Sequence, residues 1–175
     1  IARQKDVAFA VTTYVEEVRI AVKANSGITS INQLNGKTVA TTTGTTSVQT
    51  LRKHERATGV DFKEVFGKDH ADSFLLLDSG RADAFATDDI LLFGLKKTAS
   101  NSSDFKIVGR PLSFDSYGLL VQKNNTVFLS LVNATIARLI RAGTMQSLYD
   151  KWFNPLEVPL SADLATTFKI LAIPE

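Results

Sequence analysis

Short apolar runs alternate with amphipathic segments over residues 7–116. Runs rich in β-branched and apolar residues predict strands, whereas apolar residues spaced by three or four positions predict helices. Strands are expected at 7–15, 17–24, 37–43, 62–67, 82–88 and 104–110. A short helical turn is expected at 29–36, and helices are expected at 46–58, 68–80 and 89–99. This alternation predicts an α/β fold with a parallel sheet that is covered on both faces.

Capping residues support the ends of two of these helices. Gly59 follows the helix at 46–58, and a glycine there readily adopts the left-handed conformation that ends a helix. Asp69 and Asp72 have the spacing of a capping-box variant at the start of the next helix.

The pattern changes at residue 117. One more strand is expected at 117–123, followed by three helical patterns, the last at 162–171. The apolar stripe of the first comprises Phe128, Val132, Ile136, Leu139 and Ile140, and that of the second comprises Met145, Leu148, Tyr149, Trp152 and Phe153. Stripes of this width predict helices that pack on another surface.

Composition narrows the possible functions only modestly. The 175 residues are 44% apolar and 22% charged, as in an ordinary globular protein, and no apolar run approaches the roughly 18 residues of a membrane span. The formal net charge of +2 gives no reason to expect a nucleic-acid partner. The absence of cysteine excludes disulfides and thiolate chemistry. Because the chain begins Ile1-Ala2-Arg3, we expect a piece of a longer protein or a processed product.

The loop Thr42–Ser47 is the first candidate for ligand chemistry. It joins an expected strand to an expected helix, and helix N-termini at such junctions attract carboxylates and phosphates. Gly44 allows close backbone approach, and Thr45, Thr46 and Ser47 add hydroxyl donors. The loop lacks the lysine of a P-loop and the glycine pattern of a dinucleotide site. The alternative is that its hydroxyls are ordinary helix N-caps.

Three further side chains are candidates, each with an ordinary alternative. Asp88 follows a strand and could accept an ammonium group or cap its own helix. His70 lies in the first turn of a helix, where the helix dipole favours the neutral ring unless an anion is near. Arg3 could clamp a carboxylate or could simply be solvated.

Taken together, these candidates form a more specific pattern. Three strand–helix junctions would bring Thr46, His70 and Asp88 to one edge of the sheet. Donors, a neutral imidazole and a carboxylate complement a zwitterion that carries an extra acidic group. The sequence therefore predicts an amino-acid pocket without a catalytic reaction.

Several stretches resemble the periplasmic solute-binding proteins of polar amino-acid uptake systems, specifically the glutamate/aspartate-binding branch. They are ARQKDVAF, LNGKTVATTTGTTS, KDHADSFLLLDSGRADAFATDD, IVGRPLSFDSYGLLVQK and GTMQSLYDKWF. Their order and spacing follow the family over the whole chain. The resemblance implies a type II periplasmic-binding-protein fold, a clamp that closes on its ligand and docks on the membrane permease of an ABC importer. It also implies a periplasmic location, reached through a signal peptide that this chain does not include, and no cofactor.

The resemblance also implies a role for each candidate residue. Arg3 matches the arginine that pairs with the ligand α-carboxylate, and Thr46, with Gly44 and Thr45 in its loop, matches the threonine that donates to it from the other lobe. Asp88 matches the acceptor of the α-ammonium. His70 matches the residue that touches the side-chain carboxylate in this branch.

Family members normally have a further N-terminal segment that forms most of the first lobe. Residues 1–10 would then be the end of lobe 1 and the first hinge strand, 11–116 would be lobe 2, and 117–175 would be the second hinge strand and the C-terminal helices of lobe 1. Without that segment, we expect Phe128, Ile136, Leu148 and Trp152 to form an exposed apolar patch. A partner would cover it, either a domain-swapped or otherwise intertwined homodimer or a separate fragment. The simpler alternative is that the N-terminal segment belongs to the protein and has been lost from this chain.

Two other functions remain open from sequence. An enzyme on the same fold, such as a dehydratase, would need a general acid and base that converge on one substrate. The residues to consider are His70 with Asp72 or Asp88, or a Ser73–His70–Asp triad, but no nucleophile elbow accompanies Ser73. A sensory ligand-binding module would need membrane or DNA-binding flanks.

Overall fold

The computed structural model describes residues 2–158 and 160–173 and divides into two compact units. One unit runs from Glu16 to Phe114, and the other combines Ile1–Val15 with Asp115–Glu175. The lobe boundaries expected near residues 10 and 117 stay a prediction, because they refer to a two-lobed clamp larger than this chain.

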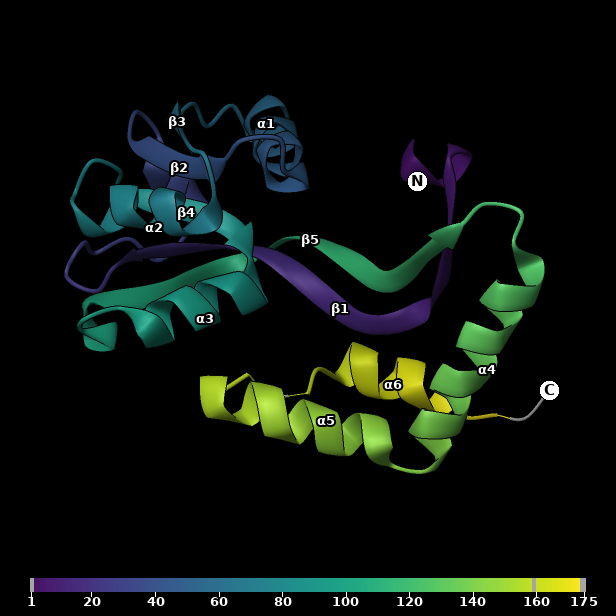
Figure 1. Cartoon of the computed structure of the whole chain (residues 1–175). Coiled ribbons are helices and arrows are strands. Elements are labelled where there is room, and N and C mark those ends of the chain that lie inside the picture. Colours follow the sequence, from purple (N-terminus) through teal and green to yellow (C-terminus); the bar gives the residue numbers. More distant parts are fainter. Residues whose placement is uncertain (1, 159, 174–175) are drawn as a thin grey trace. The chain divides into compact units, whose positions relative to one another are not determined.

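The strands form a five-stranded sheet in the order β3-β2-β4-β1-β5 (Figure 1). They are β1 (Val7–Lys23), β2 (Thr38–Thr42), β3 (Lys63–Gly67), β4 (Ala84–Asp88) and β5 (Phe105–Gln122). Strand β2 pairs in parallel with both β3 and β4. Strand β1 pairs antiparallel with β4, and Val18 lies opposite Asp88 in that register.

Two expectations about the strands were wrong. The sheet is mixed and not fully parallel, because β1 runs antiparallel to β4. The segments 7–15 and 17–24 form the single strand β1, in which Glu16 is almost fully buried and does not mark an end. The segments 104–110 and 117–123 likewise belong to the single strand β5, which continues through Gly109, where φ is 79°.

The helices of the Glu16–Phe114 unit agree with the sequence pattern. They are α1 (Thr46–Thr58), α2 (His70–Asp78) and α3 (Asp89–Thr98), with 3-10 turns η2 (Ile31–Leu34) and η3 (Ser102–Asp104). Gly59 ends α1 with φ at 74°, and its N–H donates to the Glu55 carbonyl, as expected. Asp69 caps α2 by accepting from the Asp72 N–H at 2.8 Å, while the Asp72 carboxylate accepts from the Lys68 N–H at 3.1 Å.

Two apolar clusters cover the two faces of this sheet. Leu51 of α1 packs with Val39 of β2 and Ala84 and Ala86 of β4 on one face. The other face packs against α2 and α3 through a second cluster that includes Ala40, Phe74, Leu77, Phe85 and Leu92. Alternation along β2 and β4 sends successive side chains to opposite faces of the sheet. Burial of each large apolar side chain contributes about 1.5–3 kcal/mol to the stability of the fold.

The second unit contains η1 (Ala2–Lys5) and the described helices that follow residue 115. These later helices are α4 (Thr126–Arg141), α5 (Thr144–Phe153), η4 (Asn154–Leu156) and α6 (Ala162–Leu171). Phe153 stacks on Tyr14 with a centroid distance of 5.2 Å and on Tyr149 with a centroid distance of 4.5 Å. The Val11 N–H donates to Asn133 Oδ1 at 2.9 Å, which joins β1 to α4.

Apolar side chains are exposed on these helices. Phe128, Leu148 and Trp152 are exposed, with 62% of Trp152 accessible to solvent, as expected. Ile136 is buried at 5% exposure, so its expected place in the patch was wrong. It lies on α4, which packs against both α5 and α6.

No single helix among the described residues is long and apolar enough to cross a membrane. The segments Thr126–Arg141 and Thr144–Leu156 meet the length and composition criteria only together, as a pair bent by 80°.

Candidate functional site

Three helices begin at one edge of the sheet. Because β2, β3 and β4 run in the same direction, their carboxyl ends meet at a common edge. Helix α1 begins at Thr46 after β2, α2 begins at His70 after β3, and α3 follows Asp88 at the end of β4. The structure therefore places Thr46, His70 and Asp88 at one edge, where open α/β sheets bind ligands.

The loop before α1 leaves the start of the helix without a side-chain cap. Gly44 has φ of 78°, a left-handed conformation that favours glycine. Thr45 is at the N-cap position, but its hydroxyl donates to the Thr42 carbonyl at 2.8 Å and does not cap the helix. The Thr45 side chain therefore does not cap the first N–H groups of α1, so they can donate hydrogen bonds to an anion.

The hydroxyl donors expected from this loop need correction. The Thr45 proton is engaged inside the loop. Ser47 is 1% exposed and buried in the helix start, so its hydroxyl does not reach the surface. Thr46 is exposed. The loop's donors to a ligand are thus mainly backbone N–H groups and Thr46.

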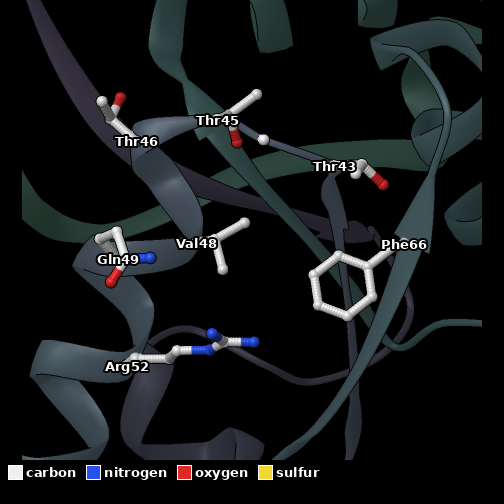
Figure 2. A pocket seen from close by; sticks show the side chains of 8 residues that line it. Thr43, Thr45, Thr46, Val48, Gln49, Arg52 and Phe66 are labelled. Atoms are coloured by element: carbon white, nitrogen blue, oxygen red, sulfur yellow. The ribbon is translucent and has the colours of Figure 1, made fainter.

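A hollow of about 540 Å³ opens beside this loop (Figure 2). It is lined by Thr43, Gly44, Thr45, Thr46, Val48, Gln49, Arg52 and Phe66. Figure 2 shows the Arg52 guanidinium and the Phe66 ring on opposite sides of this space, from α1 and β3. Neither residue was a candidate from sequence. The one available signal was that Arg52 lies one helical turn after Val48, which places both side chains on the same face of α1.

Glu64 holds the guanidinium of Arg52. Arg52 Nε and Nη2 lie 3.0 Å and 2.7 Å from Glu64 Oε2. The hydrogen bond and the charge of Glu64 raise the pKa of Arg52 above its ordinary value. Because a carboxylate already neutralises it, Arg52 is a weaker anion receptor than an unpaired arginine would be.

The His70 ring is joined to the sheet through hydroxyls. Its Nδ1 lies 2.9 Å from Thr42 Oγ1, and Thr42 Oγ1 lies 2.9 Å from Ser73 Oγ. Ser73 Oγ also lies 2.9 Å from the Asp69 carbonyl oxygen and 3.0 Å from the Thr41 carbonyl oxygen. From sequence, Thr42 was only the first residue of the candidate loop and Ser73 only a member of a possible triad. Their contacts through Thr42 to the His70 ring were not expected, although alternation already placed Thr42 on the opposite strand face from Thr41.

Ser73 is not positioned as a nucleophile. Its side chain is completely buried, and the Thr42 hydroxyl lies between it and His70. A nucleophilic serine needs an exposed Oγ beside a general base. Ser73 and His70 of the triad considered from sequence are therefore part of the packing between α2 and β2.

The two neighbouring aspartates have different surroundings. Asp88 is at the N-cap position of α3 but makes no side-chain hydrogen bond to the helix start. Asp89 Oδ1 instead accepts from the Ile90 N–H at 2.8 Å and from the Glu17 N–H at 3.3 Å. Burial is the main cause that raises the pKa of Asp89, and the two backbone donors and Arg19 oppose it. The alternative considered from sequence was that Asp88 caps α3. The Asp88 side chain makes no capping hydrogen bond to the described start of α3.

Alternation along β4 indicates which face Asp88 occupies. Ala84 and Ala86 pack in the cluster that contains Leu51 of α1. Asp88 follows them at the same period of two, which places its carboxylate on the α1 face of the strand. The exposed start of α1 and Asp88 therefore belong to the same side of the sheet edge.

Arg3 lies in η1 and is exposed. It belongs to the compact unit that does not contain the other candidates. Its role stays a prediction.

Comparison with protein families identifies the chain. The family model described as bacterial extracellular solute-binding proteins, family 3, matches residues 1–155. The chain belongs to this family. The resemblance inferred from the sequence is thereby confirmed.

Two curated members of the solute-binding family are similar over most of the chain. The glutamate/aspartate import solute-binding protein of Salmonella typhimurium is 39% identical over 157 residues, which cover 89% of this chain and 52% of that protein. The L-glutamate/L-aspartate-binding protein of Pseudomonas aeruginosa is 35% identical over 180 residues, which cover 98% of this chain and 59% of that protein. The chain spans about half the length of these curated relatives.

Solved structures confirm the expected type II fold. The GluR0 ligand-binding core from Nostoc punctiforme, in complex with L-glutamate, is 32% identical with a TM-score of 0.74, and the match covers 88% of this chain and 68% of that one. An ancestral arginine-binding protein bound to arginine is 33% identical with a TM-score of 0.76, and the match covers 87% of this chain and 66% of that one. These neighbours bind amino acids of different side-chain charge, so the fold alone does not specify the ligand.

Proposed function

We propose that this chain is part of a non-catalytic binding protein that takes up L-glutamate or L-aspartate. The observation that carries the proposal is the meeting of three helix starts at one sheet edge, with Thr46, His70 and Asp88 among them. Each contributes a different chemistry, and together they complement an acidic amino acid.

The proposed contacts follow from charge and hydrogen-bonding capacity. The start of α1, from Gly44 to Thr46, binds the α-carboxylate through N–H groups that Thr45 does not cap. Asp88 accepts from the α-ammonium, and charge-assisted bonds of this kind are the strong ones. His70 donates to the side-chain carboxylate. Arg3 is proposed as a second partner of the α-carboxylate.

The printed names of the relatives support both the ligand class and the transport role. The Salmonella protein is named for glutamate/aspartate import and the Pseudomonas protein for binding of L-glutamate and L-aspartate. We propose that the protein containing this chain works in the periplasm and delivers its ligand to the membrane permease of an ABC importer.

Calorimetric titration separates a binder from an enzyme. L-glutamate, L-aspartate and L-glutamine are titrated in turn, and the ligand is recovered afterwards and analysed. The proposal predicts saturable heat with the two acidic amino acids and recovery of unchanged ligand. Conversion of the ligand to a product would support a dehydratase-like enzyme, and absence of heat with both acidic amino acids would contradict the proposal.

The exposed apolar side chains of α4 and α5 give a second, structural proposal. Phe128, Leu148 and Trp152 are exposed on these helices. Exposed apolar patches in monomers are rare beyond a few hundred Å². We propose that a second copy of the chain covers them in a homodimer, including one formed by domain swapping. Light scattering should give the dimer mass, and Trp152→Glu should shift it to the monomer; a monomeric wild-type chain would contradict the proposal.

A further inference from the structure

A chain of hydroxyl groups links His70 to a backbone carbonyl. This hydroxyl relay consists of His70, Thr42 and Ser73, with 2.9 Å between His70 Nδ1 and Thr42 Oγ1 and 2.9 Å between Thr42 Oγ1 and Ser73 Oγ. Thr42 is 5% exposed and Ser73 is completely buried, so water does not compete for these hydrogen bonds.

The buried end of the hydroxyl relay has a fixed direction. Ser73 Oγ lies 2.9 Å from the Asp69 carbonyl oxygen and 3.0 Å from the Thr41 carbonyl oxygen. Carbonyl oxygens only accept, so the arrangement with the most hydrogen bonds points the Ser73 proton to one of them. Ser73 Oγ then offers a lone pair to Thr42, and the Thr42 hydroxyl donates to Ser73.

This direction determines which ring nitrogen of His70 carries the proton. Because the Thr42 hydroxyl donates its proton to Ser73, Thr42 Oγ1 can only accept a hydrogen bond from the His70 ring. Nδ1 must then be protonated. In the neutral ring Nε2 is left with a lone pair, and it cannot donate to a carboxylate.

The opposite direction is less favourable. It would send the Ser73 proton to Thr42 and the Thr42 proton to His70 Nδ1. Ser73 Oγ would then face two carbonyl oxygens at 2.9 Å and 3.0 Å without a proton toward either. This arrangement makes one hydrogen bond fewer at a buried site and turns oxygen lone pairs toward each other, so the first direction is favoured.

We propose that Thr42 and Ser73 are positioning residues that fix His70 as the Nδ1–H tautomer, so that binding of an acidic amino acid takes up a proton at Nε2. This inference rests on the proposed function, because it concerns how His70 holds the ligand side-chain carboxylate. A ligand with a neutral side chain, such as glutamine, can donate to the Nε2 lone pair and needs no proton. The hydroxyl relay thus couples side-chain charge to proton uptake.

The charged surroundings of His70 come from four packed elements and its own helix. Helix α2 packs on β2, β3, β4 and α3. The charged residues on these elements, on α2 and just before it are Lys63, Glu64, Lys68, Asp69, Asp72, Asp78, Asp88, Asp89, Lys96 and Lys97. Asp69 and Asp72 already accept from backbone N–H groups at the start of α2. Any proton that Asp88 takes up or releases on binding is the same for both ligands, so the difference in proton uptake between glutamate and glutamine does not contain it.

The tautomer can be read without any ligand. The chain has two histidines, so ¹⁵N-histidine labelling gives one signal set for His70 and one for His54 as internal reference. Long-range ¹H–¹⁵N correlation distinguishes Nδ1–H from Nε2–H rings. We expect Nδ1–H for neutral His70 in the wild type and in Thr42→Ser, and a gain of the Nε2–H form in Thr42→Val. A wild-type ring that carries its proton on Nε2 would overturn the proposal.

Proton uptake is measured by titration calorimetry in buffers with different ionisation enthalpies near neutral pH. We expect uptake of about one proton when L-glutamate binds and of none when L-glutamine binds. Thr42→Val should lower the uptake toward zero, and Thr42→Ser should retain it. Glutamate binding without proton uptake would overturn the proposal. If neither acidic amino acid binds, the proposed function fails together with the proton uptake, while the ligand-free tautomer still tests the relay itself.

Discussion

Gly67 and Ser73 approach so closely that a β-carbon on Gly67 would lie 2.5 Å from the Ser73 backbone nitrogen and closer still to its hydroxyl. Gly67 ends β3, and Ser73 lies in α2 at the buried end of the hydroxyl relay. The missing side chain at Gly67 therefore lets α2 approach the sheet edge and carry His70 to Thr42.

Gly67→Ala should destabilise the protein by about 2–3 kcal/mol, because the new methyl group overpacks a backbone contact. The measurement is urea unfolding followed by circular dichroism. Gly94→Ala is the matched control: Gly94 lies inside α3 with nothing within 4 Å of its added β-carbon. That substitution should stabilise by about 0.5–1 kcal/mol. Equal effects at both positions would refute the close approach.

Asp88→Asn should weaken L-glutamate binding by roughly 10- to 100-fold, because it removes the charge that pairs with the α-ammonium. Asparagine keeps the size of the side chain and is equally suited to an N-cap position, so the melting temperature should change little. The measurement is titration calorimetry with a thermal scan. Asp61→Asn, an exposed change in the segment just before β3, serves as the control. Wild-type affinity in the Asp88 variant would remove Asp88 from the site.

His70→Ala should weaken L-glutamate more than L-glutamine, because only glutamate presents a side-chain carboxylate to the ring. Competition binding with the two ligands measures the ratio of their affinities. A charge-assisted hydrogen bond contributes about 1.5–3 kcal/mol, so the ratio should change by roughly 10-fold or more. Equal losses for both ligands would show that His70 does not read the side-chain charge.

Asp89 predicts a pH dependence of stability. Burial raises the pKa of Asp89 in the folded protein, so its stabilising contribution is fully present below the pKa of the unfolded chain and is lost as pH rises through the folded-state pKa. Asp89→Asn removes this titration and keeps the Oδ1 acceptor for Glu17 and Ile90. The variant should therefore become more stable relative to wild type, with a larger free energy of unfolding, as pH rises from acidic to neutral. A relative stability that is constant or moves the opposite way would contradict this assignment.

The helices could be predicted from sequence because their end signals are local. Helix α1 begins at Thr46 and ends before Gly59, where the left-handed conformation closes it. The strands were harder to predict, because a strand's length and direction depend on its partner. Glu16 suggested a break in β1 but is buried, and nothing in the alternation of β1 indicated that it would run antiparallel to β4.

The candidate site could be predicted in outline but not in its supporting contacts. Thr46, His70 and Asp88 all follow parallel strands, so their common edge follows from the order of elements. The buried contacts of Thr42, Ser73 and Asp89 were missed because each residue looks ordinary in sequence. Their importance arises from burial, which makes each hydroxyl or carboxylate depend on a specific partner.

The most direct test is a ¹H–¹⁵N chemical-shift map of the protein during titration with L-glutamate. If the sheet edge holds the ligand, the largest saturable shifts will come from the backbone amides of Thr46, His70 and the Asp88–Asp89 pair. Shifts confined to the hollow beside Arg52 and Phe66, with the amides of His70 and Asp88 unchanged at saturation, would contradict the account.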